Sequence, residues 1–180
     1  MASELRVDRI IPVDGVPTGG GGGVIQVTQG NMNSRSLTTS QAYVASGLSG
    51  TITPRFNSSK VLVTVTTVGT WYAGLATLGV IIRRKVGGSY IANSPLGDTG
   101  HGAINSPDGA TIGMYTNDGS GANNQMPMTI QWWDSPGTTS EITYEFWIAT
   151  NGADGAGVGG FANQTGYDSY SQIIMMEVSG

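Results

Sequence analysis

The residues that could carry out acid–base or metal chemistry are few in this 180-residue chain. The only histidine is His101, in the sequence DTGHGA, and one histidine cannot supply a multi-histidine metal site. The chain has no cysteine, which excludes disulfides, thiolate nucleophiles and cysteine-ligated metals. The sequence Asp98-Thr99-Gly100 matches the aspartic-protease loop, but that chemistry needs two carboxylates that share a proton, and the sequence contains no second copy. We therefore predict no catalytic residue, no metal site and no cofactor.

Two further motifs have the residue types of an active site without the surroundings that it requires. Carboxylates for glycoside cleavage could come from Asp134, Glu141 and Glu145. Glu141 and Glu145 share one strand face, but they lie ~13 Å apart by strand rise, which exceeds the usual carboxylate separation. The sequence GAGVGG at 155–160 has the spacing of a dinucleotide-binding loop, which must open a helix. Because the following residues are poor helix formers, we interpret this stretch as part of a long surface loop.

The composition predicts a surface that is hydrated but carries little charge. Charged residues make up 11% of the chain, and 29 residues are glycine; about 25% charged residues is typical of globular proteins. The net charge of −4 leaves no large basic surface for nucleic acid, and we interpret the cluster Arg83-Arg84-Lys85 as a solvated strand end. No apolar run approaches the ~18 residues of a membrane span. Such a composition is typical of extracellular β-proteins and parts of virions.

Short β-prone segments separated by Gly, Asn, Asp and Pro turns make up most of the chain. The clearest is SKVLVTVTTVGTWYAG, in which Val61, Val63 and Val65 share one face. No window of 11 residues has apolar positions at helical spacing. The sequence therefore predicts an all-β fold, an antiparallel β-sandwich or jelly roll, with a short N-terminal arm.

The first residues predict an arm joined to the sandwich by a flexible linker. Residues 1–18 are too few for a domain, residues 19–23 are five consecutive glycines, and residues 24–180 form the predicted head domain. A disordered tail is the alternative, but the apolar content of the arm favours a peptide that docks on a partner. The residues predicted to dock are Leu5, Val7, Ile10, Ile11 and Val13.

Residues 126–148 read as a long hairpin with aromatic residues on both of its strands. Side chains alternate between the faces of a strand, so the even-numbered residues of both strands are predicted to face the core. Trp133 and Trp147 then project from the polar face. An exposed aromatic side chain leaves about 150–250 Å² of surface in water, so we expect something to cover both of them.

The closing strand, YSQIIMMEVSG, is apolar on both parities, which indicates burial on both faces. A neighbouring subunit would cover the second face most simply, and a loop of the same chain is the alternative. Ile174, Met176 and Val178 lie on one parity, and Ile173, Met175 and Glu177 lie on the other. The residues predicted to form a subunit interface are therefore Trp133, Trp147, Ile173 and Met175.

Several segments resemble a family of small virion proteins of tailed bacteriophages, which are tail-fibre or minor structural proteins. They are MASELRVDRIIPVDG, NSSKVLVTVTTVG, DSPGTTSEITYEF and YSQIIMMEVSG. The most specific of them is DSP-x-TTS-x-x-TY, whereas Ser169-Tyr170-Ser171-Gln172 departs from the usual SSIT ending. The resemblance implies a jelly-roll head similar to the tumour-necrosis-factor type, a homotrimer located in the virion, and an N-terminal peptide that anchors the head to other virion proteins.

Three functions remain open at this point. The first is a fibre or spike head that attaches to a host surface glycan or protein through distal loops, without nucleic-acid binding or membrane insertion. The second is a capsid decoration protein or tail adaptor with a structural role, and the third, an enzyme acting on surface polysaccharide, is disfavoured because no carboxylate pair is suitable. The loop residues predicted to bind the host ligand are Tyr115, Asn117, Asp118, Asn163 and Tyr167.

Overall fold

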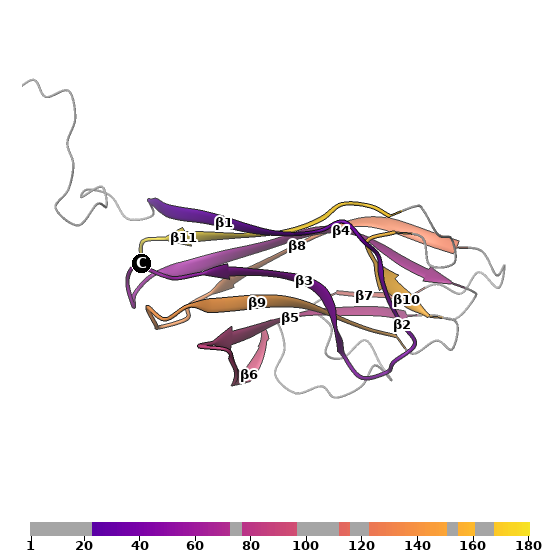
Figure 1. The fold of residues 1–180 in the computed structure, drawn as a ribbon, viewed down its shortest axis with the longest axis horizontal. Coiled ribbons are helices and arrows are strands. Elements are labelled where there is room, and N and C mark those ends of the chain that lie inside the picture. Colours follow the sequence, from indigo (N-terminus) through magenta and orange to yellow (C-terminus); the bar gives the residue numbers. More distant parts are fainter. Residues whose placement is uncertain (1–22, 73–76, 97–111, 116–122, 151–154, 161–167) are drawn as a thin grey trace, which may run out of the picture.

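The computed structural model describes residues 23–72, 77–96, 112–115, 123–150, 155–160 and 168–180, with the backbone alone at 72, 92–96, 112–115 and 123. All regular elements within these residues are β-strands, and they form two antiparallel sheets that lie one over the other (Figure 1). The predicted all-β sandwich is therefore confirmed. The predicted arm and most of the glycine linker lie outside the described residues.

The two layers are here called sheet A and sheet B. Sheet A has the order β1 (Val24–Met32), β11 (Ser171–Val178), β4 (Lys60–Tyr72) and β8 (Asn123–Asp134), and β10 (Ala156–Val158) and β2 (Ser36–Thr38) extend it where β11 ends. Sheet B has the order β3 (Val44–Ile52), β9 (Ile142–Thr150) and β5 (Thr77–Val86), with β6 (Ser89–Leu96) and β7 (Ile112–Tyr115) both paired to the outer edge of β5.

The order of these strands is that of a jelly roll. The chain places β1 in sheet A and β3 in sheet B, then β4 in A and β5 in B, then β8 in A and β9 in B, and it returns with β11 between β1 and β4. Each sheet therefore alternates early and late strands, the arrangement of two interleaved Greek keys. The β7 strand lies within the predicted segment DGATIGMYTNDG.

The core lies between the sheets and follows the period-two pattern of the sequence. Val61, Val63 and Val65 of β4 are fully buried, as their shared parity predicts. The even-numbered residues of β8 and β9 also face the core, with the exception of Met126, which is exposed near the end of β8. Other large members of this core include Leu48, Trp71, Leu78, Ile82, Ile130, Ile142, Tyr144, Phe146, Ile148, Ile173 and Met175.

The predicted hairpin over residues 126–148 is wrong. β8 pairs with β4 in sheet A, whereas β9 pairs with β3 and β5 in sheet B. The turn between them crosses the edge of the sandwich, so the two core-facing sets meet across the interior instead of lying side by side. A local pattern of two strands and a turn does not distinguish these arrangements, because both give the same alternation of side chains.

The predicted surface loop is also corrected in part, because the GAGVGG sequence contains a buried strand. Residues 155–160 are all buried, and β10 lies between β4 and β2. A Cβ atom on Gly157 would collide with the backbone carbonyl of Ser36 on β2. The glycine here permits a close approach of two strands, and its spacing reflects packing rather than phosphate binding.

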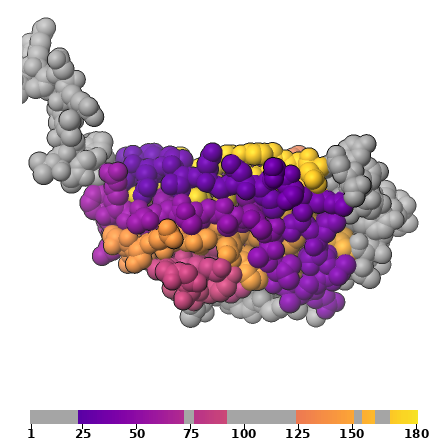
Figure 2. Space-filling model, viewed as in Figure 1, coloured from indigo at the N-terminus to yellow at the C-terminus, as the bar shows by residue number. Residues whose placement is uncertain are grey.

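The two sheets also come very close along the side where β1 lies against β3. This side is visible in Figure 2, where the strands of residues 24–52 cover the seam between the layers. A Cβ atom on Gly30 of β1 would overlap the carbonyl oxygen of Ser49 on β3. Glycine at this position therefore allows β1 and β3 to close one edge of the sandwich.

We expect Gly30→Ala to lower the free energy of unfolding by about 3 kcal/mol, at the upper end for over-packing, because backbone atoms on both strands must move apart. Urea denaturation of the two proteins measures the difference. Gly23→Ala is the matched control, since no heavy atom lies within 4 Å of the added carbon, and it should change stability by less than about 0.5 kcal/mol. Equal effects of both substitutions would contradict the close approach.

Candidate functional site

One row of paired residues on the inner face of sheet A is unusually polar. Gln26 of β1, Glu177 of β11, Val61 of β4 and Asp134 of β8 are successive neighbours across the four strands. Glu177 is fully buried, and Asp134 is nearly so. We call these four residues the inner polar row. A sandwich normally places apolar side chains at such positions, so this row needs internal hydrogen bonds.

Neutral donors satisfy the Glu177 carboxylate. Gln26 Nε2 donates to Glu177 Oε2 at 2.6 Å, while the backbone N–H of Arg55 and the hydroxyl of Ser59 donate to Oε1 at 2.7 and 2.6 Å. These donors come from β1 and from the segment between β3 and β4. The carboxylate therefore ties the closing strand to segments far away in the sequence, since a buried charge is tolerated only when it is well hydrogen-bonded.

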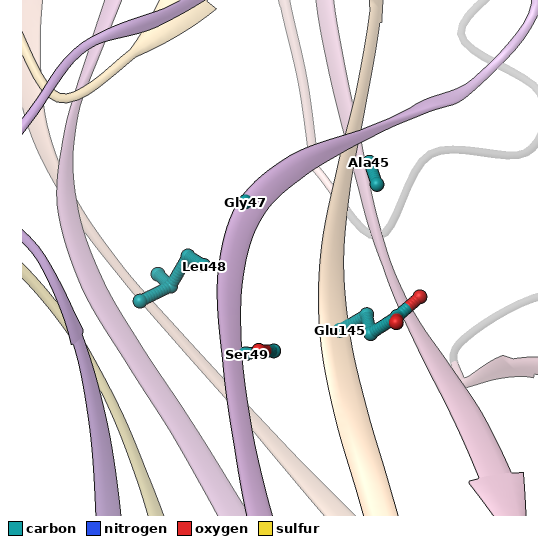
Figure 3. Close-up of a pocket in the computed structure, with 5 residues that line it drawn as sticks. All are labelled: Ala45, Gly47, Leu48, Ser49 and Glu145. Atoms are coloured by element: carbon teal, nitrogen blue, oxygen red, sulfur yellow. The ribbon is translucent and has the colours of Figure 1, made fainter. Parts of the chain in front are cut away.

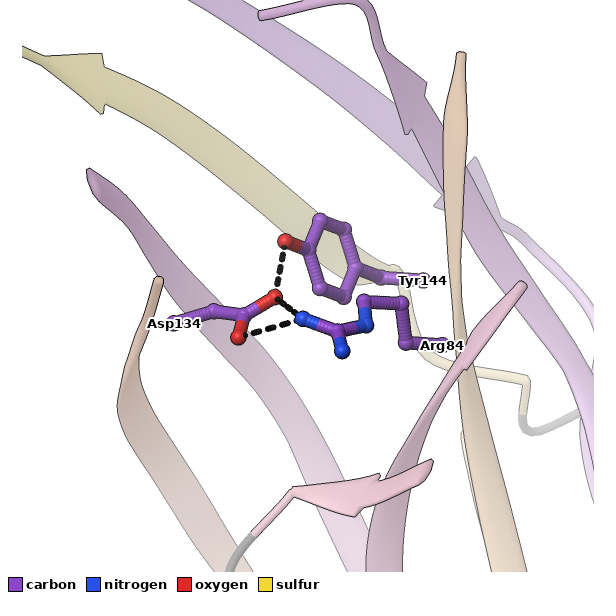
Figure 4. Close-up of polar contacts among 3 residues, drawn as sticks. All are labelled: Arg84, Asp134 and Tyr144. Atoms are coloured by element: carbon purple, nitrogen blue, oxygen red, sulfur yellow. Dashed lines mark hydrogen bonds and ion pairs between the residues drawn. The ribbon is translucent and has the colours of Figure 1, made fainter. Parts of the chain in front are cut away.

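Asp134 connects the two sheets. Arg84 Nη1 of β5 donates to both of its carboxylate oxygens at 2.7 Å, and the Tyr144 hydroxyl of β9 donates to Oδ2 at 2.7 Å (Figure 4). Burial and the adjacent Asp134 carboxylate raise the pKa of Tyr144, so its hydroxyl stays protonated and acts as a donor. Asp134 is thus committed to an internal ion pair.

The row of residues next to the inner polar row points outward from sheet A and is apolar. Val27 of β1, Met176 of β11, Leu62 of β4 and Trp133 of β8 are successive neighbours across the same four strands. We call these four residues the outer apolar row. Trp133 is 54% exposed and Val27 is 53% exposed, while Met176 and Leu62 are half-buried. At this end of sheet A, polar side chains therefore face inward and apolar ones face outward.

The surroundings of the outer apolar row are apolar or neutral. Val24 and the half-buried Ile174 and Val178 lie next to it on β1 and β11. Beyond them the face carries amides and hydroxyls, including Gln172, whose Nε2 donates to Gln29 Oε1 at 2.8 Å. Within β1, β4, β8 and β11, Lys60 is the one charged residue on the outward parity. An apolar centre with a neutral hydrogen-bonding rim is the usual composition of a protein–protein interface.

The structure corrects part of the predicted interface. Ile173 and Met175 are fully buried in the core of their own chain, and the outward residues of the closing strand are Ile174, Met176 and Val178. Both parities of this strand are apolar, and the chain buries the one carboxylate among them, Glu177, so the alternation alone did not show which parity faces the core.

The two tryptophans of the predicted interface do project from the core, but to opposite sides of the molecule. Trp133 lies on the outer face of sheet A, and Trp147 lies half-buried on the outer face of sheet B. The four residues predicted to form one interface are therefore not brought together.

Trp147 belongs to a cluster of rings and charges, here called the aromatic–cation cluster. Its ring meets the Tyr90 ring edge-on at 5.7 Å between centroids. The guanidinium carbon of Arg83 lies 4.2 Å from the Tyr90 centroid and 4.4 Å from the Trp147 centroid. Lys85 Nζ lies 2.6 Å from Glu145 Oε1. These five residues come from β5, β6 and β9, so the cluster fastens β6 to the rest of sheet B.

Glu145 is the polar centre of this cluster. The Tyr90 hydroxyl and Trp147 Nε1 donate to its Oε2 at 2.6 and 3.0 Å, in addition to the contact of Lys85 with Oε1. Burial alone would raise the pKa of Glu145, but the hydrogen bonds from Lys85, Tyr90 and Trp147 outweigh it and lower the pKa. The predicted solvated strand end at 83–85 is wrong, because all three side chains are half-buried and engaged in ring contacts or ion pairs.

A shallow pocket of about 50 Å³ lies next to Glu145. Strand β3 leaves the register of β9 between Ala45 and Ser49, and Gly47 takes a positive φ of 91° at this bulge. The Ser46 hydroxyl donates to the Phe146 carbonyl and accepts from the Leu48 N–H. Both backbone groups are therefore hydrogen-bonded where the ladder is interrupted. Figure 3 shows Ala45 and Glu145 on one side of the strands and Leu48 directed to the other, toward the core.

The remaining predicted residues are mostly outside the described part of the chain. This applies to the docking residues of the arm, to His101, and to Asn117, Asp118, Asn163 and Tyr167 of the predicted ligand site. Tyr115 is described by its backbone alone, in β7. Among the described residues, no three His, Cys, Asp or Glu side chains cluster as metal ligands would. The three carboxylates predicted for glycoside cleavage are not brought together. Glu141 is exposed, Asp134 lies on the inner face of sheet A, and Glu145 lies on the outer face of sheet B.

No protein-family model matches the chain, and no curated protein matches it. In the described residues there is no helix of the length and hydropathy that a membrane crossing needs.

Several residues of these surfaces were missed by the sequence analysis. Val27 and Leu62 belong to ordinary β-prone segments, so only the register across four strands reveals that they adjoin Met176 and Trp133. Arg83 and Tyr90 were missed because their contacts with Trp147 form between strands that are separate in the sequence. The two-sided apolar pattern of β11 was the one available signal for the outer apolar row.

We expect Glu177→Ala to destabilise the chain by about 2–4 kcal/mol, because it leaves the buried Ser59 hydroxyl and the part-buried Arg55 N–H without their acceptor. Chemical denaturation provides the measurement. Glu141→Ala removes the same charge at an exposed position and should cost less than about 0.5 kcal/mol. If Glu177→Ala were equally harmless, the inner polar row would not stabilise the fold.

We expect Glu145→Gln to destabilise the chain at pH 7 by less than about 1 kcal/mol, as for a partly exposed ion pair. Because the folded-state pKa of Glu145 is lowered, its contribution is present above the unfolded-state pKa of about 4.3 and is lost as the pH falls through the folded-state pKa. Unfolding curves at pH 7, 5, 4 and 3 should therefore converge for the two proteins at the acid end. A difference that stays constant with pH, or that grows in acid, contradicts the assignment.

Proposed function

We propose that the protein is a bacteriophage virion structural protein, a homotrimeric tail-fibre or spike head that attaches to a host surface. The observation that carries the assembly part is the outer apolar row, in which Trp133 and Val27 are each more than half exposed on a neutral sheet face. The resemblance of MASELRVDRIIPVDG and DSPGTTSEITYEF to phage virion proteins supports the virion part. The role of the arm in docking to other virion proteins is proposed on its sequence alone.

The occupant of the outer apolar row in this proposal is a second copy of the chain. A face with Lys60 as its one outward charge can approach a copy of itself without strong like-charge repulsion. The row crosses four adjacent strands, which at about 4.8 Å per strand is ~15 Å of continuous surface. Burial of Trp133, Val27, Met176 and Leu62 would remove from water the apolar area that the isolated chain exposes.

A capsid decoration protein or a tail adaptor would use the same assembly face without a host ligand. Cryo-electron microscopy of the intact particle distinguishes these roles, because it shows whether the head lies at the tip of a fibre or on the capsid. Density at the fibre tip is the expected result, and density on the capsid would replace attachment by decoration.

We expect Trp133→Glu to convert the assembled protein to a monomer while the sandwich stays folded. The side chain is exposed in the single chain, so its replacement does not disturb the core, but a charge buried within the interface would remain without a partner. Sedimentation equilibrium at micromolar concentration should give three times 18.6 kDa for the natural sequence and 18.6 kDa for the variant. Far-ultraviolet circular dichroism checks that the strands are retained.

The matched control is Thr139→Glu, which adds the same charge at an exposed position in the turn after β8. This variant should sediment like the natural sequence. A natural chain that sediments as a monomer, or a Trp133→Glu variant that remains trimeric, would refute assembly through the outer apolar row.

A further inference from the structure

The outer face of sheet B has a chemistry different from that of sheet A. Ser49 of β3, Glu145 of β9 and Arg83 of β5 are successive neighbours across three strands. This places a hydroxyl, a carboxylate and a guanidinium group in a line about 10 Å long. Trp147 and Tyr90 flank the line, and Tyr90 is 40% exposed. Hydrogen-bonding groups beside aromatic rings are the combination that recognises a polar ligand with apolar patches.

The cluster carries a positive charge that no described residue neutralises. Lys85 pairs with Glu145 and Arg84 pairs with Asp134, whereas Arg83 contacts the two rings. Among the described residues none accepts a hydrogen bond from the buried Arg83 Nε. The planar guanidinium is held in position by the rings and suits recognition of a carboxylate. An anionic group would therefore complement the charge of Arg83.

The pocket next to Glu145 gives the ligand a second point of contact. It lies between the β3 bulge and Glu145, and Ser49, Gly47 and Ala45 line it (Figure 3). Three donors already fix the Glu145 carboxylate, and a carboxylate has about four acceptor sites. One acceptor site remains for a ligand hydroxyl, and the exposed Ser49 hydroxyl can donate or accept beside it.

We propose that the outer face of sheet B binds an acidic saccharide, whose carboxylate pairs with Arg83 and whose hydroxyl groups bond Glu145 and Ser49. A simple anion would leave the pocket unused, and a neutral sugar would leave the charge of Arg83 uncompensated. The proposal rests on the attachment role given above and names its ligand class. It places the site on Ser49, Arg83 and Glu145 of sheet B, and not on the loop residues that the sequence predicted.

The test uses the full chain and two probes with one skeleton, tri-galacturonic acid and its methyl ester. Titration is followed by calorimetry and by the indole N–H signals in proton–nitrogen correlation spectra. Trp147 Nε1 donates to Glu145, so its signal reports directly on this site, and Trp147→Phe assigns it. We expect the acid to bind and to shift this signal. The ester should bind with an affinity lower by roughly tenfold or more, because it lacks one charge-assisted hydrogen bond.

Two variants test the contacts separately. Arg83→Gln should weaken binding of the acid by roughly tenfold or more and leave binding of the ester unchanged. Ser49→Glu, at an exposed position outside the ring stack, should repel the acid without disturbing the fold. Arg55→Gln is the control, because it removes the same charge at an exposed position elsewhere. Thermal melts of each variant confirm folding.

The outcomes separate this proposal from the proposed function. Equal affinity for acid and ester, or no shift of the Trp147 signal at millimolar acid, overturns the acidic-saccharide site. Sedimentation of the same samples reports assembly independently, so a trimer without binding refutes this site alone. A monomer that binds the acid supports the site and refutes the assembly through sheet A.

Discussion

The inner polar row is the constraint on which the rest of the structure depends. Glu177 and Asp134 bury two carboxylates on the core side of sheet A and bond them to β1, to the segment before β4, and to sheet B. A slip of β11 by one residue would turn Glu177 to the outside and Met176 to the core, and would break these bonds. The same register places Val27, Leu62, Met176 and Trp133 together on the outward side. The bonds that hold the buried carboxylates therefore also fix the position of this exposed row.

The sequence allowed the fold class and most of the core to be predicted, because period-two alternation is a local signal. Val61, Val63 and Val65 are buried as predicted, and so are Tyr144 and Phe146. The assignment of β8 and β9 to different sheets could not be predicted, because a hairpin and a crossing give the same alternation. The parity of β11 was predicted wrongly for a different reason. The donors to Glu177 lie more than a hundred positions away in the sequence, so no local pattern shows that this carboxylate is buried.

The candidate surfaces could be predicted only in part. The outward parity of Trp133 and Trp147 was correct, but the partition of β8 and β9 between the sheets places them on opposite faces of the sandwich. The sequence Arg83-Arg84-Lys85 shows why charge runs are hard to interpret. Alternation along β5 sends Arg84 inward to Asp134, while Arg83 and Lys85 point outward to the rings and to Glu145. Three consecutive cations therefore have three different environments, each fixed by a strand that is distant in the sequence.

The two outer faces suit two different partners, and their separation allows both to be occupied at once. The face of sheet A is neutral and apolar at its centre, which favours packing against other copies of the chain. The face of sheet B is hollowed at the β3 bulge and has Glu145, Ser49 and an uncompensated Arg83 within one line. Two packed sheets keep these faces apart by about 10 Å of core. A neighbour bound on sheet A would therefore leave sheet B open to solvent, so each copy in an assembly could present its own ligand site.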